Sequence, residues 1–288
     1  MCKVGLFTIV KNEHCYLDEW LYYHINLGID EIYVFDDVGS DSHKEICNKY
    51  KNVTHKGILE IYPQVRHNSI IKNKINHTAY LGYQLMFMCD CISYIKNNSD
   101  INWLSNIDID EFITLENEKD SIKEVLNCYL SYEILILQWL NYNANGNIEK
   151  PEGGVLDVYN KTCIPYFGKT MDPRASCKMF FNLNICKLDN LDLTIHIPKS
   201  TYNYCKTNYS RDLYTLSYNR LYIRHYITKS FREWCEKLYV RGQFQGSKKL
   251  SQFFGFNPDI DIRDISVQNI INEYADRVLS GELPLYLF

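Results

Sequence analysis

The chain lacks the features that would place it in several common classes of protein. No segment approaches the ~20 consecutive apolar residues of a membrane-spanning helix. A net charge of −4 at pH 7 gives no overall positive field for nucleic acid or an anionic membrane. The short apolar run over residues 4–10 predicts a first strand rather than a signal peptide. We therefore expect a soluble, cytoplasmic protein without a nucleic-acid partner or a transmembrane segment.

Paired cysteine motifs are also missing. The sequence has 11 cysteines, but the number is odd, the spacings are scattered, and no pair of C-x-x-C elements marks a zinc site. Cys89 and Cys91 are too close in sequence for an ordinary disulfide. This pattern predicts free thiols in a reducing compartment.

What the chain does have is ample apolar material in an alternating pattern of strands and helices. Its 288 residues, 46% of them hydrophobic, suffice for a large buried core. In the first part, strands are expected at 4–10, 31–35 and 57–62, and helices at 16–27 and 74–96. In the second half, strands are expected at 134–140, 177–181 and 191–197, and helices at 228–244 and 266–279. The alternation predicts a doubly wound α/β fold. Because no repeat or break in composition divides the chain, we expect one domain with an elaborated C-terminal half.

The most informative segment is Ile107-Asp108-Ile109-Asp110-Glu111-Phe112, which follows an apolar run. The alternation predicts a strand that carries Asp108 and Asp110 to one face at the edge of a sheet. Because two close carboxylates raise each other's pKa, such a pair favours a bound Mg²⁺ or Mn²⁺ ion, whose remaining ligands are commonly substrate phosphates. The alternative is a solvated strand end whose acidic residues cap a following helix.

Two further strand ends carry polar side chains. Lys11, Asn12 and Glu13 follow the first expected strand, and Asp36 and Asp37 follow the second. Strand ends of an open parallel sheet converge on one crevice, so these residues and the acidic pair predict a single nucleotide site. Taken alone, Asn12 and Asp37 are more typical of turn or capping residues.

Taken in order along the chain, these segments resemble the GT-A glycosyltransferases of family 92 and the family 2-like type. The first blocks are Lys11-Asn12-Glu13, Leu17-Asp18-Glu19-Trp20-Leu21 with His24 and Leu27-Gly28, Ile32-Tyr33-Val34-Phe35-Asp36-Asp37 with Ser40-Asp41, Trp103-Leu104, and the acidic segment. The later blocks are Trp139 with an Asn- and Gly-rich loop and Pro151, Lys178, His196, His225-Tyr226, Lys229-Ser230, Lys237 and Arg241-Gly242. The resemblance covers residues 3–245. The chain departs from it at Tyr142-Asn143-Ala144-Asn145-Gly146-Asn147, where the family has an aromatic-Gly-Ser-Ser-Gly-His loop.

The resemblance implies a GT-A fold and a metal-dependent hexosyltransferase. Such an enzyme moves a sugar from a nucleotide-sugar donor to a glycan or other hydroxyl acceptor with inversion. The donor expected is UDP-linked. It implies Mn²⁺ or Mg²⁺ held by Asp108, Asp110 and His225. The donor contacts that it implies are Lys11, Asn12, Glu13, Asp36, Asp37, Asp108, Lys229 and Arg241. The single domain, 1–288, would comprise a nucleotide-sugar-binding half (1–115), an acceptor-side half (116–245) and a C-terminal helical extension (246–288).

The sequence leaves two alternatives open in the later blocks. His225 is either a metal ligand or a packed, hydrogen-bonded histidine beside Tyr226. Lys229, Lys237 and Arg241 are expected on one helical face, where they either neutralise the donor pyrophosphate or form an exposed ion-pair ladder.

The catalytic base and the competing functions are also open. Inverting transfer needs a carboxylate that deprotonates the acceptor hydroxyl, and Asp172 and Glu152 are candidates that the sequence does not decide between. A sugar nucleotidyltransferase would have a Gly-rich phosphate loop after the first strand, which is missing here. A carbohydrate-binding or scaffold protein that has kept the fold without turnover is the alternative that the altered Asn-rich loop supports.

Overall fold

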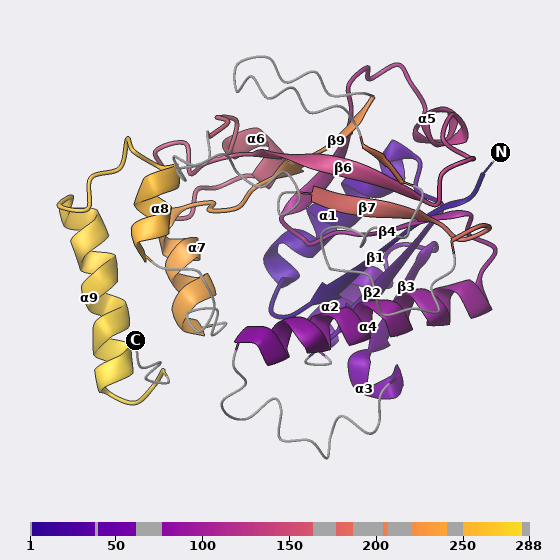
Figure 1. Cartoon of the computed structure of the whole chain (residues 1–288). Helices are drawn as coiled ribbons and strands as arrows, with labels where there is room; N and C mark the ends of the chain where they lie inside the picture. Colours follow the sequence, from indigo (N-terminus) through magenta and orange to yellow (C-terminus); the bar gives the residue numbers. More distant parts are fainter. Residues whose placement is uncertain are drawn as a thin grey trace. The chain divides into compact units, whose positions relative to one another are not determined.

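The computed structural model describes residues 2–37, 40–61, 77–163, 177–186, 204–206, 220–240 and 250–283 (Figure 1). The chain divides into two compact units. The first consists of Met1–Trp139 and Asp172–Arg224, and the second of Leu140–Met171 and His225–Phe288. We describe each unit by itself.

The first unit is built around a mixed β-sheet. The described strands follow the order β3-β2-β1-β4-β7-β6-β9-β5, and β8 pairs with β6. Their bounds are β1 Val4–Val10, β2 Glu31–Asp36, β3 Val53–Gly57, β4 Trp103–Asn106, β5 Glu111–Leu115, β6 Ile134–Asn141, β7 Cys177–Asn182, β8 Tyr204–Lys206 and β9 Leu221–His225. The neighbours β3-β2-β1-β4 are parallel, whereas β7 is antiparallel to both β4 and β6.

Five helices of the described chain belong to this unit: α1 His14–Leu27, α2 Asp41–Cys47, α3 Ile58–Ile61, α4 His77–Asn98 and α5 Ile122–Asn127. The chain runs from β1 through β2 to β3 and then returns past β1 to β4. Right-handed crossovers therefore place α1 and α2 on one face of the sheet and α4 on the other, and Figure 1 shows α4 along one side of the strands. This is the doubly wound α/β fold that the sequence predicts.

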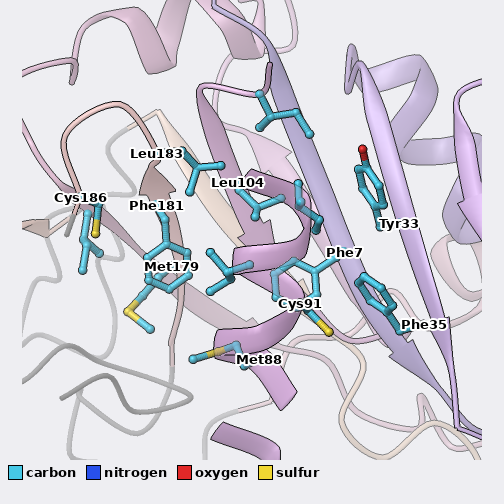
Figure 2. Packing of buried hydrophobic residues seen from close by; sticks show 14 of the residues in the cluster. Phe7, Tyr33, Phe35, Met88, Cys91, Leu104, Met179, Phe181, Leu183 and Cys186 are labelled. Atoms are coloured by element: carbon cyan, nitrogen blue, oxygen red, sulfur yellow. The ribbon is translucent and has the colours of Figure 1, made fainter. Parts of the chain in front are cut away.

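The main core of the first unit lies between α4 and the sheet (Figure 2). Met88 and Cys91 of α4 pack with Phe7, Leu104 and Phe181, which come from three neighbouring strands. Residues that alternate along each strand point to one face, so the apolar alternation seen in the sequence produces this layer directly.

The second unit contains mostly helices. They are α6 Val155–Val158, α7 Phe231–Cys235 with a π-helical continuation η4 Glu236–Val240, α8 Leu250–Phe256 and α9 Ile265–Leu279. Their apolar faces form a separate core around Phe231, Trp234, Phe253 and Tyr274. No helix in the described residues is long and apolar enough to cross a membrane.

The expected elements agree with the structure where the apolar periodicity is strong. The first two strands, the first helix and the last helix lie within two residues of their predicted bounds. The strand expected at 57–62 is wrong, because β3 pairs with β2 only up to Gly57 and the chain then turns into α3. The helix expected at 228–244 begins only at Phe231. The strand expected at 191–197 lies outside the described residues.

The ten cysteines whose side chains the structure describes are free thiols, as the sequence predicts.

Candidate functional site

The parallel strands bring the predicted polar segments to one edge of the sheet. β1 ends at Val10, which is in register with Asp36 at the end of β2, and Asp36 is in register with Gly57 at the end of β3. On the other side of β1, β4 ends at Asn106, two residues before Asp108. In an open α/β sheet, ligands bind at the carboxyl ends of the strands where the strand order reverses. The predicted convergence of the strand ends is confirmed.

The acidic segment forms a tight turn between β4 and β5. The backbone N–H of Glu111 donates to the Asp108 carbonyl at 3.0 Å, and the Glu111 carboxylate accepts from the Asp108 N–H at 2.8 Å. Ile107 and Ile109 are buried, whereas the Asp108 side chain is 59% exposed and Asp110 is half-buried. The alternation of buried and exposed residues is therefore confirmed, but the strand predicted to carry both aspartates is wrong. They lie in the turn because Glu111 closes it.

Lys178 of β7 lies beside this turn. Its ammonium donates to Asp108 Oδ2 at 2.9 Å and lies 3.4 Å from Glu111 Oε2. The Lys178 side chain is only 7% exposed, and the Glu111 side chain is fully buried. The negative charges of Asp108 and Asp110 raise the pKa of both Glu111 and Lys178. The turn is thus a cluster of three carboxylates and one ammonium, with an exposed carboxylate at its surface.

The protonation of this cluster is set by opposing effects. Burial raises the pKa of Glu111 well above its usual range, while the Lys178 ammonium opposes the shift and the Asp108 and Asp110 carboxylates add to it. Burial lowers the pKa of Lys178, but the surrounding carboxylates outweigh burial and hold that pKa above its usual range. Lys178 is therefore a permanent cation. With all four groups ionised, the cluster would carry a formal charge of −2.

Helix α1 fixes the other side of the turn through two buried side chains. Trp20 Nε1 donates to the Glu111 carbonyl at 2.8 Å. The Ile113 N–H donates to His24 Nε2 at 3.2 Å, so His24 Nδ1 carries the hydrogen and donates to the Trp20 carbonyl at 2.8 Å. Both residues belong to the segments on which the family resemblance rests, and in the structure they hold the start of β5.

We expect His24 to make stability depend on pH. Burial lowers its pKa from 6.5 to about 3, so between these values only the unfolded chain takes up the proton. The free energy of unfolding therefore rises with pH over this window by at most about 1.4 kcal/mol per pH unit. The contribution is complete above pH 6.5 and is lost as the pH falls towards 3. Urea unfolding of the wild type and of His24→Gln at pH 4.5, 5.5 and 6.5 would test this. The stability difference should shrink as the pH falls, and a difference that does not change with pH would contradict it.

The end of β2 is held by a buried hydrogen-bonded group. Asp36 Oδ2 accepts from the Ser40 N–H at 2.8 Å and from His43 Nδ1 at 3.0 Å, and lies 3.2 Å from His55 Nε2. His43 Nε2 in turn accepts from the Glu13 N–H at 3.0 Å, which fixes the tautomer. Asp36 at the end of β2 thus contacts His55 of β3 directly, and through His43 it is connected to the Glu13 backbone just after β1. A contact between Asp36 and the donor stays a prediction.

Next to this group lies a cavity of about 360 Å³, lined by Ser40, Asp41, Lys44, His55, Gly57 and Glu60. Lys11 and Asp37 form an ion pair of 3.7 Å at the same edge of the sheet. Asn12 has a left-handed backbone with φ 56°, a conformation that asparagine tolerates well. The turn role that the sequence allows for Asn12 is confirmed.

His225, the last residue of β9, and Asn141, the last residue of β6, belong to the second unit, whereas most of both strands belongs to the first. His225 Nδ1 donates to Asn141 Oδ1 at 2.9 Å, because an amide oxygen only accepts. The hydrogen is therefore on Nδ1 and the lone pair is on Nε2, which is the form that a metal ligand requires. The packed, hydrogen-bonded histidine is confirmed, and metal binding by His225 stays a prediction. Among the described residues, no group of three or more His, Cys, Asp or Glu is arranged to hold a metal ion.

The predicted basic helical face is wrong. Lys229 precedes the N-cap Ser230 of α7, has φ 54°, and is buried. Lys237 lies in η4, is also buried, and donates to the Ile227 carbonyl at 3.2 Å. An exposed ion-pair ladder is therefore excluded for these two residues. Arg241 lies outside the described residues.

The Asn-rich loop is held by its own amides. Asn145 Nδ2 donates to the Val158 carbonyl at 3.0 Å, and Asn147 Nδ2 donates to the Ala144 carbonyl at 2.8 Å. The Ala144 N–H donates to Asn257 Oδ1 at 2.6 Å. The residues that replace the family's Gly-Ser-Ser-Gly-His pattern thus stabilise the backbone of this loop. Of the two proposed bases, Glu152 is exposed and Asp172 lies outside the described residues, as does His196.

Sequence reasoning missed the roles of Lys178, Glu111 and His43. The signal for Lys178 was present, since a lysine inside the apolar run 177–181 needs a charged partner when the strand is buried. Its partners are 67 and 70 positions away in the chain, so only the sheet pairing identifies them.

The sheet and the acidic turn at its reversal point define an α/β protein with its candidate site at the carboxyl ends of the parallel strands. The chain belongs to glycosyltransferase family 92, whose model matches residues 7–253. The crystal structure of HddC from Yersinia pseudotuberculosis is similar at 10% identity and a TM-score of 0.41, over 83% of this chain and 100% of that chain. That of 4-diphosphocytidyl-2C-methyl-D-erythritol synthase from Anaerococcus prevotii is similar at 11% identity and a TM-score of 0.29, over 64% of this chain and 72% of that chain. No curated protein matches the chain.

Proposed function

We propose that this glycosyltransferase is metal-dependent and moves a sugar from a UDP-linked donor. The acceptor is a hydroxyl of a glycan or similar molecule, and the transfer proceeds with inversion. The observation that supports this most is the acidic turn: an exposed Asp108 carboxylate, oriented by Lys178 and Glu111, next to a strand end at the reversal point of the sheet.

The donor set of the turn suits a hard divalent cation. Asp108 and Asp110 would hold Mn²⁺ or Mg²⁺ through oxygen, and His225 is the third ligand that the family resemblance suggests. When bound, such an ion stabilises the negative charge that develops on the leaving diphosphate.

The nucleoside end of the donor would lie at the ends of β1 and β2. Lys11, Asn12, Glu13 and Asp37 offer charged and amide groups there, and the cavity beside Asp36 has room for part of a nucleoside. Lys229 and Arg241 remain proposed contacts to the diphosphate, and Asp172 or Glu152 the proposed base.

A thermal-shift screen tests this function. We expect one class of nucleotide among UDP, GDP, CMP and dTDP, and its sugars, to raise the melting temperature only with Mn²⁺, because a ligand stabilises by about RT ln(1 + [L]/Kd). The Mn²⁺-dependent shift should vanish in Asp110→Asn and persist in Asp276→Asn, a matched change at an exposed position of α9. Stabilisation without Mn²⁺, or an equal shift in Asp110→Asn, would count against the metal site. Donor binding without transfer or donor hydrolysis would favour the binding-protein alternative.

A further inference from the structure

Lys178 occupies an unusual position for a lysine. It lies in β7, an interior strand between β4 and β6, all six residues of which are buried. Cys177, Met179 and Phe181 face the core under α4, so the alternating Lys178 points to the opposite face. Removing an ammonium from water is unfavourable unless charged partners compensate. A buried lysine in this strand therefore indicates a specific role for its charge.

The register of the sheet directs Lys178 to the acidic turn. β7 runs antiparallel to β4 with Ser105 opposite Phe180, and Ser105 Oγ donates to the Met179 carbonyl at 2.7 Å. Continuing this pairing past the end of β4 brings Lys178 alongside the turn. There its ammonium lies between the exposed Asp108 carboxylate and the buried Glu111 carboxylate.

Glu111 holds the same turn through contacts with both the Asp108 backbone and the Lys178 ammonium. Its Oε2 accepts from the Asp108 N–H at 2.8 Å and faces Lys178 at 3.4 Å, while its buried Oε1 has no hydrogen-bond partner among the described residues. The Asp108 backbone is thus held by Glu111, and the Asp108 side chain is held by Lys178. Both backbone and carboxylate of the exposed residue are fixed by buried charged groups.

We propose that Lys178 is a positioning residue, which fixes the Asp108 carboxylate through Oδ2 in the orientation that binds the divalent cation. The inference rests on the proposed function. A positioning role predicts a different result from two simpler roles of Lys178. If Lys178 formed only a structural ion pair, its removal would change folding alone. If Lys178 competed with the bound cation, its removal would strengthen cation binding.

The pair offers a variant in which both members are replaced. Lys178→Met with Glu111→Gln puts neutral side chains of similar size at both positions, so neither a buried ammonium nor a buried carboxylate is left without its partner. The side-chain amide introduced by Glu111→Gln keeps an oxygen that can accept from the Asp108 N–H. Replacing both members of a buried ion pair is commonly neutral for stability, whereas removing one is not. Lys178→Arg keeps the charge and serves as the conservative variant.

We would measure Mn²⁺ affinity by electron paramagnetic resonance, with and without UDP, and urea unfolding of the same proteins. The double variant should unfold near the wild-type midpoint yet bind Mn²⁺ about 10- to 100-fold more weakly, the loss typical of changed supporting residues around a metal. Lys178→Arg should recover part of the affinity. Unchanged or tighter Mn²⁺ binding in the double variant would overturn the proposal.

A crystallographic comparison separates this proposal from the proposed function. If the wild type binds no Mn²⁺ with any nucleotide, the metal-dependent function fails. The positioning role is then judged from metal-free crystal structures of the wild type and the double variant. It requires the Asp108 carboxylate to leave its wild-type orientation in the variant, and an unmoved carboxylate would overturn it.

Discussion

Asp108→Asn is expected to lower sugar transfer by about 10²- to 10³-fold, the usual loss when one group that stabilises transition-state charge is removed. The change keeps the size of the side chain and its ability to accept a hydrogen bond from Lys178. It removes the exposed negative charge that would hold the cation against the leaving diphosphate. The measurement is kcat and KM for the donor that the thermal-shift screen identifies, at several Mn²⁺ concentrations.

Asp108 is largely exposed, but it also faces the buried Lys178 ammonium, so the loss of its charge should lower the free energy of unfolding by about 1–3 kcal/mol and leave the protein folded. Urea unfolding and circular dichroism of the variant would confirm that. Asp276→Asn, with the same chemical change on the surface of α9, should retain full activity. Transfer by Asp108→Asn at close to the wild-type rate, with ordinary Mn²⁺ dependence, would show that the acidic turn is not the cation site.

Trp20→Ala is expected to have the largest effect on folding, about 3–5 kcal/mol of the free energy of unfolding. Trp20 is fully buried on α1, and its Nε1 donates to the Glu111 carbonyl. The substitution removes a large apolar side chain and also the bond that holds the start of β5. Urea unfolding measures the effect, and Tyr22→Ala on the exposed face of the same helix, where the side chain is 64% exposed, is the control.

Trp20→Phe separates the two contributions. It keeps most of the apolar volume and removes the donor, so it should cost about 1–3 kcal/mol, the usual effect of leaving a buried acceptor unpaired. A cost for Trp20→Ala no larger than that of Tyr22→Ala would show that α1 does not anchor β5 as described. Weaker Mn²⁺ binding in Trp20→Phe, with the fold intact, would extend the role of Trp20 to the orientation of the acidic turn.

The sequence predicts elements best where burial is regular. β1 is apolar along its length and α1 has apolar residues at helical spacing, so local spacing alone predicts both elements. The pattern does not predict β3, because all five of its residues are only half-buried. Only the pairing with β2 makes Val53–Gly57 a strand.

The same division holds for the functional site. The sequence by itself determined that Asp108 and Asp110 alternate with buried isoleucines, and that polar groups follow the strands at Val10 and Phe35, because these are properties of neighbouring residues. It also carried the ordered motifs that identify the family.

The tertiary structure alone decided what holds the acidic turn. Lys178 reaches Asp108 from 70 positions away, and Trp20 reaches Glu111 from 91 positions away. No local spacing encodes such contacts, since they depend on the order and register of strands that the whole core fixes. The carboxylates can be named from the sequence, but the buried cation and the helix that orient them become visible only when β7 and α1 are packed against the turn.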